Sequence, residues 1–132
     1  PILKKNGGKI LCISSICGFE KINNAPLGYS LAKSSLNSYV KLISGILSKK
    51  GITINSIAPG NILFKGSTWE KHLKKNHKKT MNYIKENVPQ KKFGTIDDVT
   101  NLCVFLSSDK SNFITGSTYV IDGGQTKKLY QI

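Results

Sequence analysis

The sequence predicts an α/β fold in which parallel strands alternate with helices, and three observations support this prediction. The run at residues 9–13 is apolar without alternation, as in a strand that helices cover on both faces. A segment that opens at Gly28 then carries apolar residues at helical spacing as far as about Gly51. Residues 53–58 then read as a second strand, which leads into a Pro-Gly turn. A helix between two such strands is the connection that parallel pairing needs.

Each remaining element follows from local signals. Residues 95–106 are expected to form a helix, because Thr95 is a good cap and Asp97 and Asp98 suit its first turn. Residues 109–112 are expected to form a loop, and residues 117–121 a third strand. The helix that opens at Gly28 is expected to carry an apolar stripe that Tyr39 and Ile46 widen; its members are Leu36, Val40, Ile43 and Leu47. We expect the sheet to cover one side of this helix and a partner subunit the other.

Length and composition fit one folded domain over residues 1–132, since the chain is long enough for a core and 39% of it is hydrophobic. No apolar run reaches the roughly 18 residues that suggest a membrane span. The first eight residues lack the apolar core of a signal peptide. A start at proline fits a chain cut from something longer.

The three cysteines are expected to be reduced, packed thiols. Cys12, Cys17 and Cys103 form neither a Cys-x-x-Cys pair nor an even set for disulfides. Reduced thiols favour a reducing, cytoplasmic setting.

The formal charge of +13 raises the question of a nucleic-acid partner. All twenty basic residues are lysine, however, and arginine is the residue that recognises bases and phosphates with two parallel hydrogen bonds. We therefore expect a solvated lysine surface and no nucleic-acid partner. A salt-sensitive affinity for DNA would instead indicate that the lysines bind nucleic acid.

Three polar side chains are the candidate catalytic residues. The strand at 9–13 delivers Ser15 to the carboxyl edge of the sheet, where open α/β sheets bind ligands. Tyr29 and Lys33 are four residues apart, so they share one face of the helix. A positive charge beside a phenol favours the phenolate, and such a tyrosine can exchange a proton with a reacting oxygen. The pair alone does not exclude a merely solvated lysine.

Five motifs occur in one order along nearly the whole chain, and together they resemble the short-chain dehydrogenase/reductase family. The family's glycine-rich Thr-Gly-x-x-x-Gly-x-Gly turn and its Asn-Asn-Ala-Gly strand end do not occur. The resemblance is therefore to the C-terminal half of such an enzyme. The motifs are Ser15 with Gly18, Tyr29 with Lys33, Pro59-Gly60, Ile114-Thr115-Gly116 and Asp122-Gly123-Gly124.

The resemblance implies a fold and an activity. The fold is the C-terminal half of a Rossmann-like, doubly wound parallel sheet, with three strands and without the N-terminal phosphate-binding half. The activity is hydride transfer between NAD or NADP and an alcohol or carbonyl compound. Tyr29 is then the proton donor and acceptor, Lys33 assists it and binds the nicotinamide ribose, and Ser15 positions the carbonyl oxygen. A homo-dimer or tetramer is implied in the same way.

The resemblance also implies a cofactor contact after the second strand. Pro59 and Gly60 form a tight turn there, and in relatives a backbone amide at the position of Ile62 binds the nicotinamide carboxamide. Phe64 stands where the family often has a threonine that contacts the cofactor phosphates. Ser67 and Thr68 are the candidates to replace it.

Residues 65–92 are expected to form one or two amphipathic helices, which by resemblance make a lid over the substrate. This segment holds nine lysines, two histidines and two glutamates. The lysines could meet an acidic substrate or an acidic carrier protein. His72 and His77 are five residues apart with no cysteine nearby, so no metal site is expected.

Two questions stay open from the sequence. A 3-oxoacyl group on acyl carrier protein is the substrate most associated with this pattern, and a sugar or other small polyol is the alternative. The chain could also be a noncatalytic half-domain that binds a partner through an exposed sheet edge. With half a cofactor site, the isolated 132 residues are expected to show no turnover.

Overall fold

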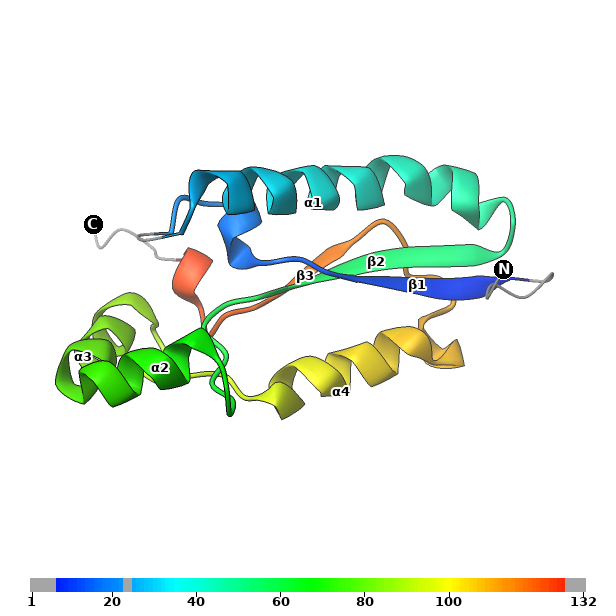
Figure 1. Cartoon of the computed structure of the whole chain (residues 1–132). Coiled ribbons are helices and arrows are strands. Elements are labelled where there is room, and N and C mark those ends of the chain that lie inside the picture. The colour runs from blue at the N-terminus through cyan, green and yellow to red at the C-terminus, as the bar shows by residue number, and fades with distance from the viewer. Residues whose placement is uncertain (1–6, 23–24, 128–132) are drawn as a thin grey trace.

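A three-stranded parallel sheet organises the molecule (Figure 1). The structure, a computed structural model, describes residues 7–22 and 25–127. The strands are β1 (Gly8–Ile13), β2 (Ile52–Pro59) and β3 (Thr118–Ile121), in the order β1-β2-β3. Between β1 and β2, Gly8 pairs with Ile52 at one end and Ile13 pairs with Ile57 at the other. The predicted three parallel strands are confirmed.

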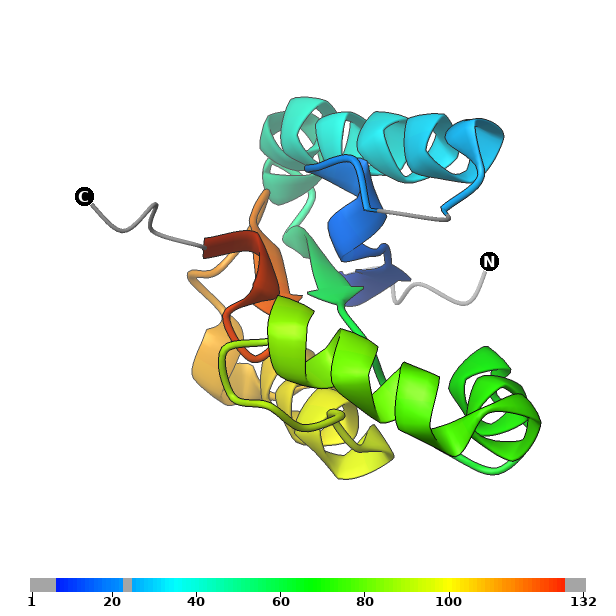
Figure 2. The ribbon, with the colours of Figure 1, turned by 90° about the vertical axis from the view of Figure 1, so that its left-hand side faces the viewer.

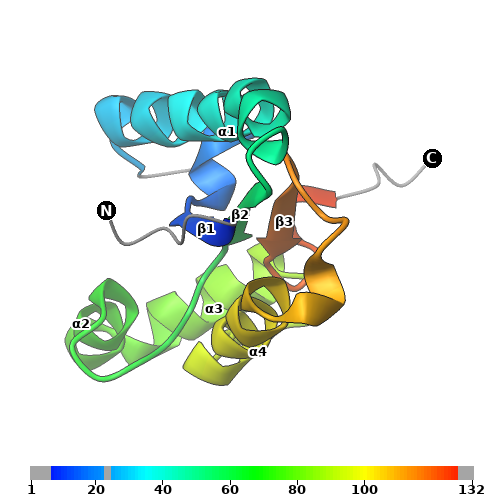
Figure 3. The ribbon, with the colours of Figure 1, turned by 90° about the vertical axis from the view of Figure 1, so that its right-hand side faces the viewer.

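Helices cover both faces of this sheet (Figures 1 and 3). α1 (Leu27–Ser48) packs on one face against β2, and α4 (Ile96–Ser107) packs on the opposite face against β1 and β2. The central strand is therefore the most buried, as an apolar strand between two helical layers should be. The buried apolar side chains include Val40, Ile54, Ile57, Ala58 and Leu106.

The apolar residues of α1 lie on more than one side of the helix. Val40 is fully buried, whereas Tyr39 and Ile46 expose 56% and 58% of their surface. The reason is angular, because neighbouring helical residues point about 100° apart. Since Val40 faces the sheet, the preceding Tyr39 is turned toward solvent.

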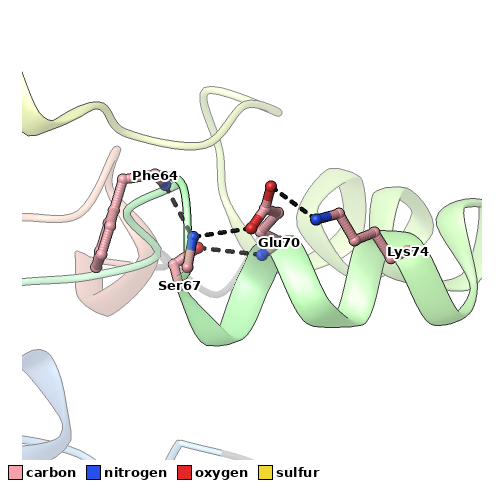
Figure 4. Close-up of polar contacts among 5 residues, drawn as sticks. Phe64, Ser67, Glu70 and Lys74 are labelled. Carbon is pink, nitrogen blue, oxygen red and sulfur yellow. Dashed lines mark hydrogen bonds and ion pairs between the residues drawn. The ribbon is translucent and has the colours of Figure 1, made fainter.

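The segment at residues 65–92, which is expected to form a lid, contains two helices, α2 (Thr68–Lys75) and α3 (His77–Asn87), beyond the carboxyl ends of the strands (Figures 1 and 2). Its role as a lid stays a prediction. Ser67 starts α2, because its Oγ accepts hydrogen bonds from the N–H groups of Glu70 (3.1 Å) and Phe64 (3.4 Å) (Figure 4). The Glu70 carboxylate accepts the N–H of Gly66 at 2.8 Å and pairs with Lys74 at 3.1 Å. These contacts lower the pKa of Glu70.

Three short 3₁₀ helices complete the secondary structure: η1 (Ile16–Gly18), η2 (Asp109–Ser111) and η3 (Gln125–Lys127). Of these, η2 lies in the segment that was expected to be an irregular loop. No helix in the described ranges is both long and apolar enough to cross a membrane. Cys12, Cys17 and Cys103 are free thiols. Burial raises the pKa of the Cys12 thiol, and the charge of Lys33 opposes that shift.

The start of α4 predicts a pH dependence of stability. The Asp98 carboxylate accepts hydrogen bonds from the backbone N–H of Thr95 (2.7 Å) and from its hydroxyl (2.8 Å). These bonds lower the pKa of Asp98, so their stabilisation is present above the ordinary aspartate pKa and is lost as the pH falls through the lowered value. In urea unfolding at a series of acidic pH values, Asp98→Asn should weaken this dependence.

The matched control for this change is Asp97→Asn. Asp97 also lies in the first turn of α4, but among the described residues its carboxylate accepts no hydrogen bond. The Asp97 variant should therefore keep the acid-side loss of stability. Identical pH curves for the two variants would contradict the assignment to Asp98.

Candidate active site

A cavity of about 690 Å³ opens beyond the carboxyl ends of the strands. Its walls come from two sides of the molecule, namely η1 and the start of α1 on one side and α2 and α3 on the other (Figure 2). Gly60 and Asn61, which follow β2, also line it. The site thus forms at the edge where parallel sheets bind ligands. Of the predicted site residues, Ser15, Tyr29 and Gly60 line this cavity.

The end of β1 places Ser15 in the cavity wall. Ser15 is 8% exposed and caps η1, because its Oγ accepts the N–H of Cys17 at 3.2 Å. A hydroxyl that accepts in this way still has its own hydrogen to donate. The neighbouring Ser14 points elsewhere and donates its hydroxyl to the backbone oxygen of Lys33 at 3.3 Å. Ser15 can therefore donate a hydrogen bond to a ligand oxygen.

Tyr29 and Lys33 share one face of α1, as predicted. Tyr29 lies in the first turns of the helix and is 44% exposed. The Nζ atom of Lys33 lies 5.6 Å from the centre of the Tyr29 ring and donates to the backbone oxygen of Ile13 at 2.8 Å. This bond fixes the lysine between the helix and the end of β1. The site therefore combines a half-exposed phenol with a fixed cation beside it.

Gly18 allows η1 to pack directly on α1 beside Lys33. A Cβ atom at Gly18 would lie 2.8 Å from the carbonyl carbon of Lys33 and 2.8 Å from Nδ2 of Asn37. Real side chains do not tolerate such contacts, so Gly18→Ala should push η1 away from the helix. We expect a loss of about 1–3 kcal/mol in the free energy of unfolding, measured with urea.

Gly45→Ala is the control for that prediction. Gly45 lies inside α1, and no atom lies within 4 Å of the position its Cβ would take. Alanine there should raise stability by roughly 0.5–1 kcal/mol, because it favours the helix. A Gly18 variant as stable as the wild type would show that the close packing of η1 on α1 is not needed.

The Pro59-Gly60 turn ends β2 and brings backbone into the cavity wall. Pro59 is the last residue of β2, and the N–H of Gly60 donates to Ile121 O at 2.8 Å. A Cβ at Gly60 would lie 2.8 Å from the Cβ of Asp122, so glycine is required by this close approach. The Asp122 carboxylate in turn accepts the N–H of Gly124 at 2.8 Å. The turn is thus held against the segment that follows β3.

Ile62 lines a second cavity, of about 320 Å³, on the side of α4 and the segment after β3. The preceding residue, Asn61, lines both this cavity and that of Ser15 and Tyr29. Ile62 forms an isolated parallel β-bridge with Gly94. Within this bridge the N–H of Leu63 donates to the backbone oxygen of Gly94 at 2.9 Å. Among the described residues, the amide of Ile62 itself donates to no protein group. Its cofactor contact stays a prediction.

The structure adds residues that the sequence did not indicate. Asn61 is buried and donates from Nδ2 to Oε1 of Gln125 at 2.7 Å, which ties the turn after β2 to η3. Tyr83 of α3 stacks on Trp69 of α2, with 5.4 Å between ring centres, and burial raises its pKa. Trp69 and Tyr83 belong to the amphipathic helices expected at residues 65–92, but their stacking was not predicted. No local signal, however, links Asn61 to a residue 64 positions away.

Comparison with known proteins decides the family. The family model described as enoyl-(acyl carrier protein) reductase matches residues 1–126. A solved short chain dehydrogenase family protein from Francisella tularensis superposes with a TM-score of 0.83 at 26% identity, over 94% of this chain and 53% of that one. The chain belongs to the short-chain dehydrogenase/reductase family. The predicted membership is confirmed.

Other members of the short-chain dehydrogenase/reductase family show the same extent of likeness. The 3-oxoacyl-acyl-carrier-protein reductase FabG of Buchnera aphidicola is 33% identical over 128 residues, which cover 93% of this chain and 48% of that protein. The L-sorbose reductase of Gluconobacter frateurii, solved with NADPH and L-sorbose, is 31% identical with a TM-score of 0.79, over 94% of this chain and 49% of its own. The chain thus spans about half the length of the relatives it matches.

Proposed function

We propose that the complete protein is an NAD- or NADP-dependent oxidoreductase that interconverts an alcohol and a carbonyl compound. One observation carries this proposal: Ser15 and Tyr29 line the same cavity, and the ammonium of Lys33 lies 5.6 Å from the Tyr29 ring. A hydrogen-bond donor, a proton donor and a fixed cation are what carbonyl reduction needs around the oxygen.

The residues of this chain have separate roles in the proposed reaction. In the direction of reduction, Ser15 donates a hydrogen bond to the carbonyl oxygen and so stabilises the negative charge that develops there. Tyr29 gives its proton to that oxygen, and Lys33 stabilises the phenolate that remains. In the direction of oxidation, the Tyr29 phenolate takes the proton back from the alcohol. A bound nicotinamide supplies or accepts the hydride at the carbon atom.

The residues present fit the nicotinamide half of such a cofactor. Gly60 lines the cavity without a side chain, and the amide of Ile62 is available as a donor among the described residues. Pro59, Gly60 and Ile62, with Lys33 for the ribose, would hold this part of the cofactor. Ser67 uses its oxygen to cap α2, whereas Thr68 lines the cavity, so Thr68 is the better placed replacement for the threonine absent at Phe64.

The relatives support either cofactor and two substrate classes. Solved neighbours carry NADPH in one case and NADH in another. FabG and an acetoacetyl-CoA reductase favour a 3-oxoacyl thioester, with acyl carrier protein as a partner. L-sorbose reductase favours a sugar as the second candidate.

The exposed face of α1 supports a homo-dimer or tetramer. Leu42 exposes 79% of its surface, and Tyr39 and Ile46 lie exposed on the same helix. The free thiols of the chain are consistent with a cytoplasmic location.

The test uses the full-length protein with NADH and NADPH in turn. Acetoacetyl-coenzyme A and L-sorbose represent the two substrate classes, and loss of the reduced nicotinamide absorbance reports turnover. We expect oxidation of at least one cofactor with at least one substrate. No oxidation in any of the four combinations, from protein shown to be folded, would contradict the proposed function.

A further inference from the structure

We propose that the active-site cavity binds a carbonyl substrate through an anionic group, held by Lys75 and Lys79. This inference rests on the proposed function, because it names a chemical class for the substrate of that same site. Lys75 is the last residue of α2 and Lys79 lies near the start of α3, and both line the cavity that holds Ser15 and Tyr29.

The charged residues that line the cavity are all of one sign, positive. Besides the two lysines, the cavity wall includes His72, whereas none of the described residues that line it is an aspartate or glutamate. The carboxylate nearest in sequence to this wall, Glu70, pairs instead with Lys74, which does not line the cavity. Among the described residues, no ion pair involves Lys75 or Lys79. Two lysines thus line the cavity, and no described aspartate or glutamate lines it with them.

A cap at the start of α3 holds the backbone of Lys79, and Lys75 directly precedes the capping residue. Asn76, between the two helices, caps α3 by accepting the N–H of Lys79 at 2.9 Å on its Oδ1. Two cations that line one cavity repel each other, and an anion between them relieves this repulsion while gaining charge-assisted hydrogen bonds. The wall is therefore suited to a carboxylate or a phosphate.

The position of the lysines defines the shape of the ligand. Ser15 and Tyr29 come from η1 and α1, whereas the lysines come from α2 and α3, so the two sets approach the cavity from different sides (Figure 2). Trp69, stacked on Tyr83, supplies apolar surface in the same cavity. The ligand is thus a molecule with its carbonyl at the serine and tyrosine, an apolar part against Trp69, and its anionic group at the lysines.

Equilibrium binding to the full-length protein, with reduced cofactor analogue present, tests this inference with two matched pairs of probes. Acetoacetate and methyl acetoacetate share the carbonyl but differ in a free carboxylate. Acetoacetyl-4′-phosphopantetheine and acetoacetyl-pantetheine share the acyl group and the thioester arm but differ in one phosphate. We expect the charged member of at least one pair to bind about tenfold or more tightly, as charge-assisted contacts imply. The pair that shows the preference identifies the carboxylate or the phosphate as the source.

Two double variants locate the preference. Lys75→Gln with Lys79→Gln should abolish it while leaving the affinity of the neutral probes unchanged. Lys71→Gln with Lys85→Gln removes the same charge from the same two helices outside the cavity, and should keep it. Equal affinities within both pairs of probes would overturn the inference. So would a charge preference that survives in the Lys75/Lys79 variant, or a preference that the Lys71/Lys85 variant loses to the same extent.

Binding separates this inference from the proposed function. If the charged probe binds through the lysines but the protein oxidises no reduced cofactor, the inference stands and the proposed activity fails. If turnover depends on Tyr29 but neither pair shows a charge preference, the activity stands and the inference fails.

Discussion

Replacing Tyr29 by phenylalanine should lower kcat by about 10²–10⁴-fold, the usual contribution of a positioned acid or base. The phenol lines the cavity and is 44% exposed, so the change removes one hydroxyl and leaves no buried group unsatisfied. Cofactor affinity and the free energy of unfolding should stay near the wild-type values. Steady-state kinetics with cofactor titration on the full-length protein would show this separation.

Tyr39→Phe is the matched control, because Tyr39 is an exposed tyrosine on the same helix that does not line the cavity. Its kcat should equal that of the wild type. Substantial turnover by the Tyr29 variant would rule out Tyr29 as the proton donor.

Replacing Ser15 by alanine should lower kcat by about 10²–10³-fold, as does loss of one donor to a developing oxyanion. Ser15 lines the cavity, and its hydroxyl keeps a hydrogen to donate while its oxygen accepts the N–H of Cys17. The lost cap of η1 should also reduce stability by about 1 kcal/mol. Kinetics and urea unfolding on the same preparation measure the two effects separately.

The preceding residue provides a control for Ser15 within the same strand end. Ser14 is more deeply buried, and its hydroxyl donates to Lys33 O instead of lining the cavity. Ser14→Ala should therefore lose stability but keep most of its kcat. Equal losses of kcat in the two variants would show that the effect comes from packing at the end of β1 and not from a donor in the cavity.

The fold could be predicted because its signals are local. Residues 53–58 could be placed as a strand because Gly51 precedes them and Pro59-Gly60 follows them. Two polar members, Asn55 and Ser56, are nevertheless buried between the helical layers, and the local pattern does not indicate this. Thr95 caps α4 as expected, so the helix begins where predicted, and the structure adds a reciprocal capping box between Thr95 and Asp98. Hydrophobicity alone does not tell which side of α1 faces the sheet, so the burial of Val40 and the exposure of Tyr39 needed the structure.

The site could be predicted where residues follow one another closely, as with Tyr29 and Lys33 on one helix. Its remaining parts depend on contacts between distant segments. Asn61 meets Gln125 across 64 residues, and the lysines of α2 and α3 reach the cavity of Ser15 only through the tertiary fold. Ile62 lines a different cavity from Tyr29, and their places in the sequence do not indicate this.

The most direct test of the central claim follows a labelled hydride. The full-length protein is given reduced nicotinamide cofactor that carries deuterium at its hydride-donating carbon, together with a carbonyl substrate that it turns over, and the product is analysed by mass spectrometry. The proposed function predicts one deuterium on the former carbonyl carbon of the alcohol, formed at a rate that falls in the Tyr29→Phe and Ser15→Ala variants. An alcohol without deuterium, or a rate that neither variant changes, would contradict hydride transfer at this site.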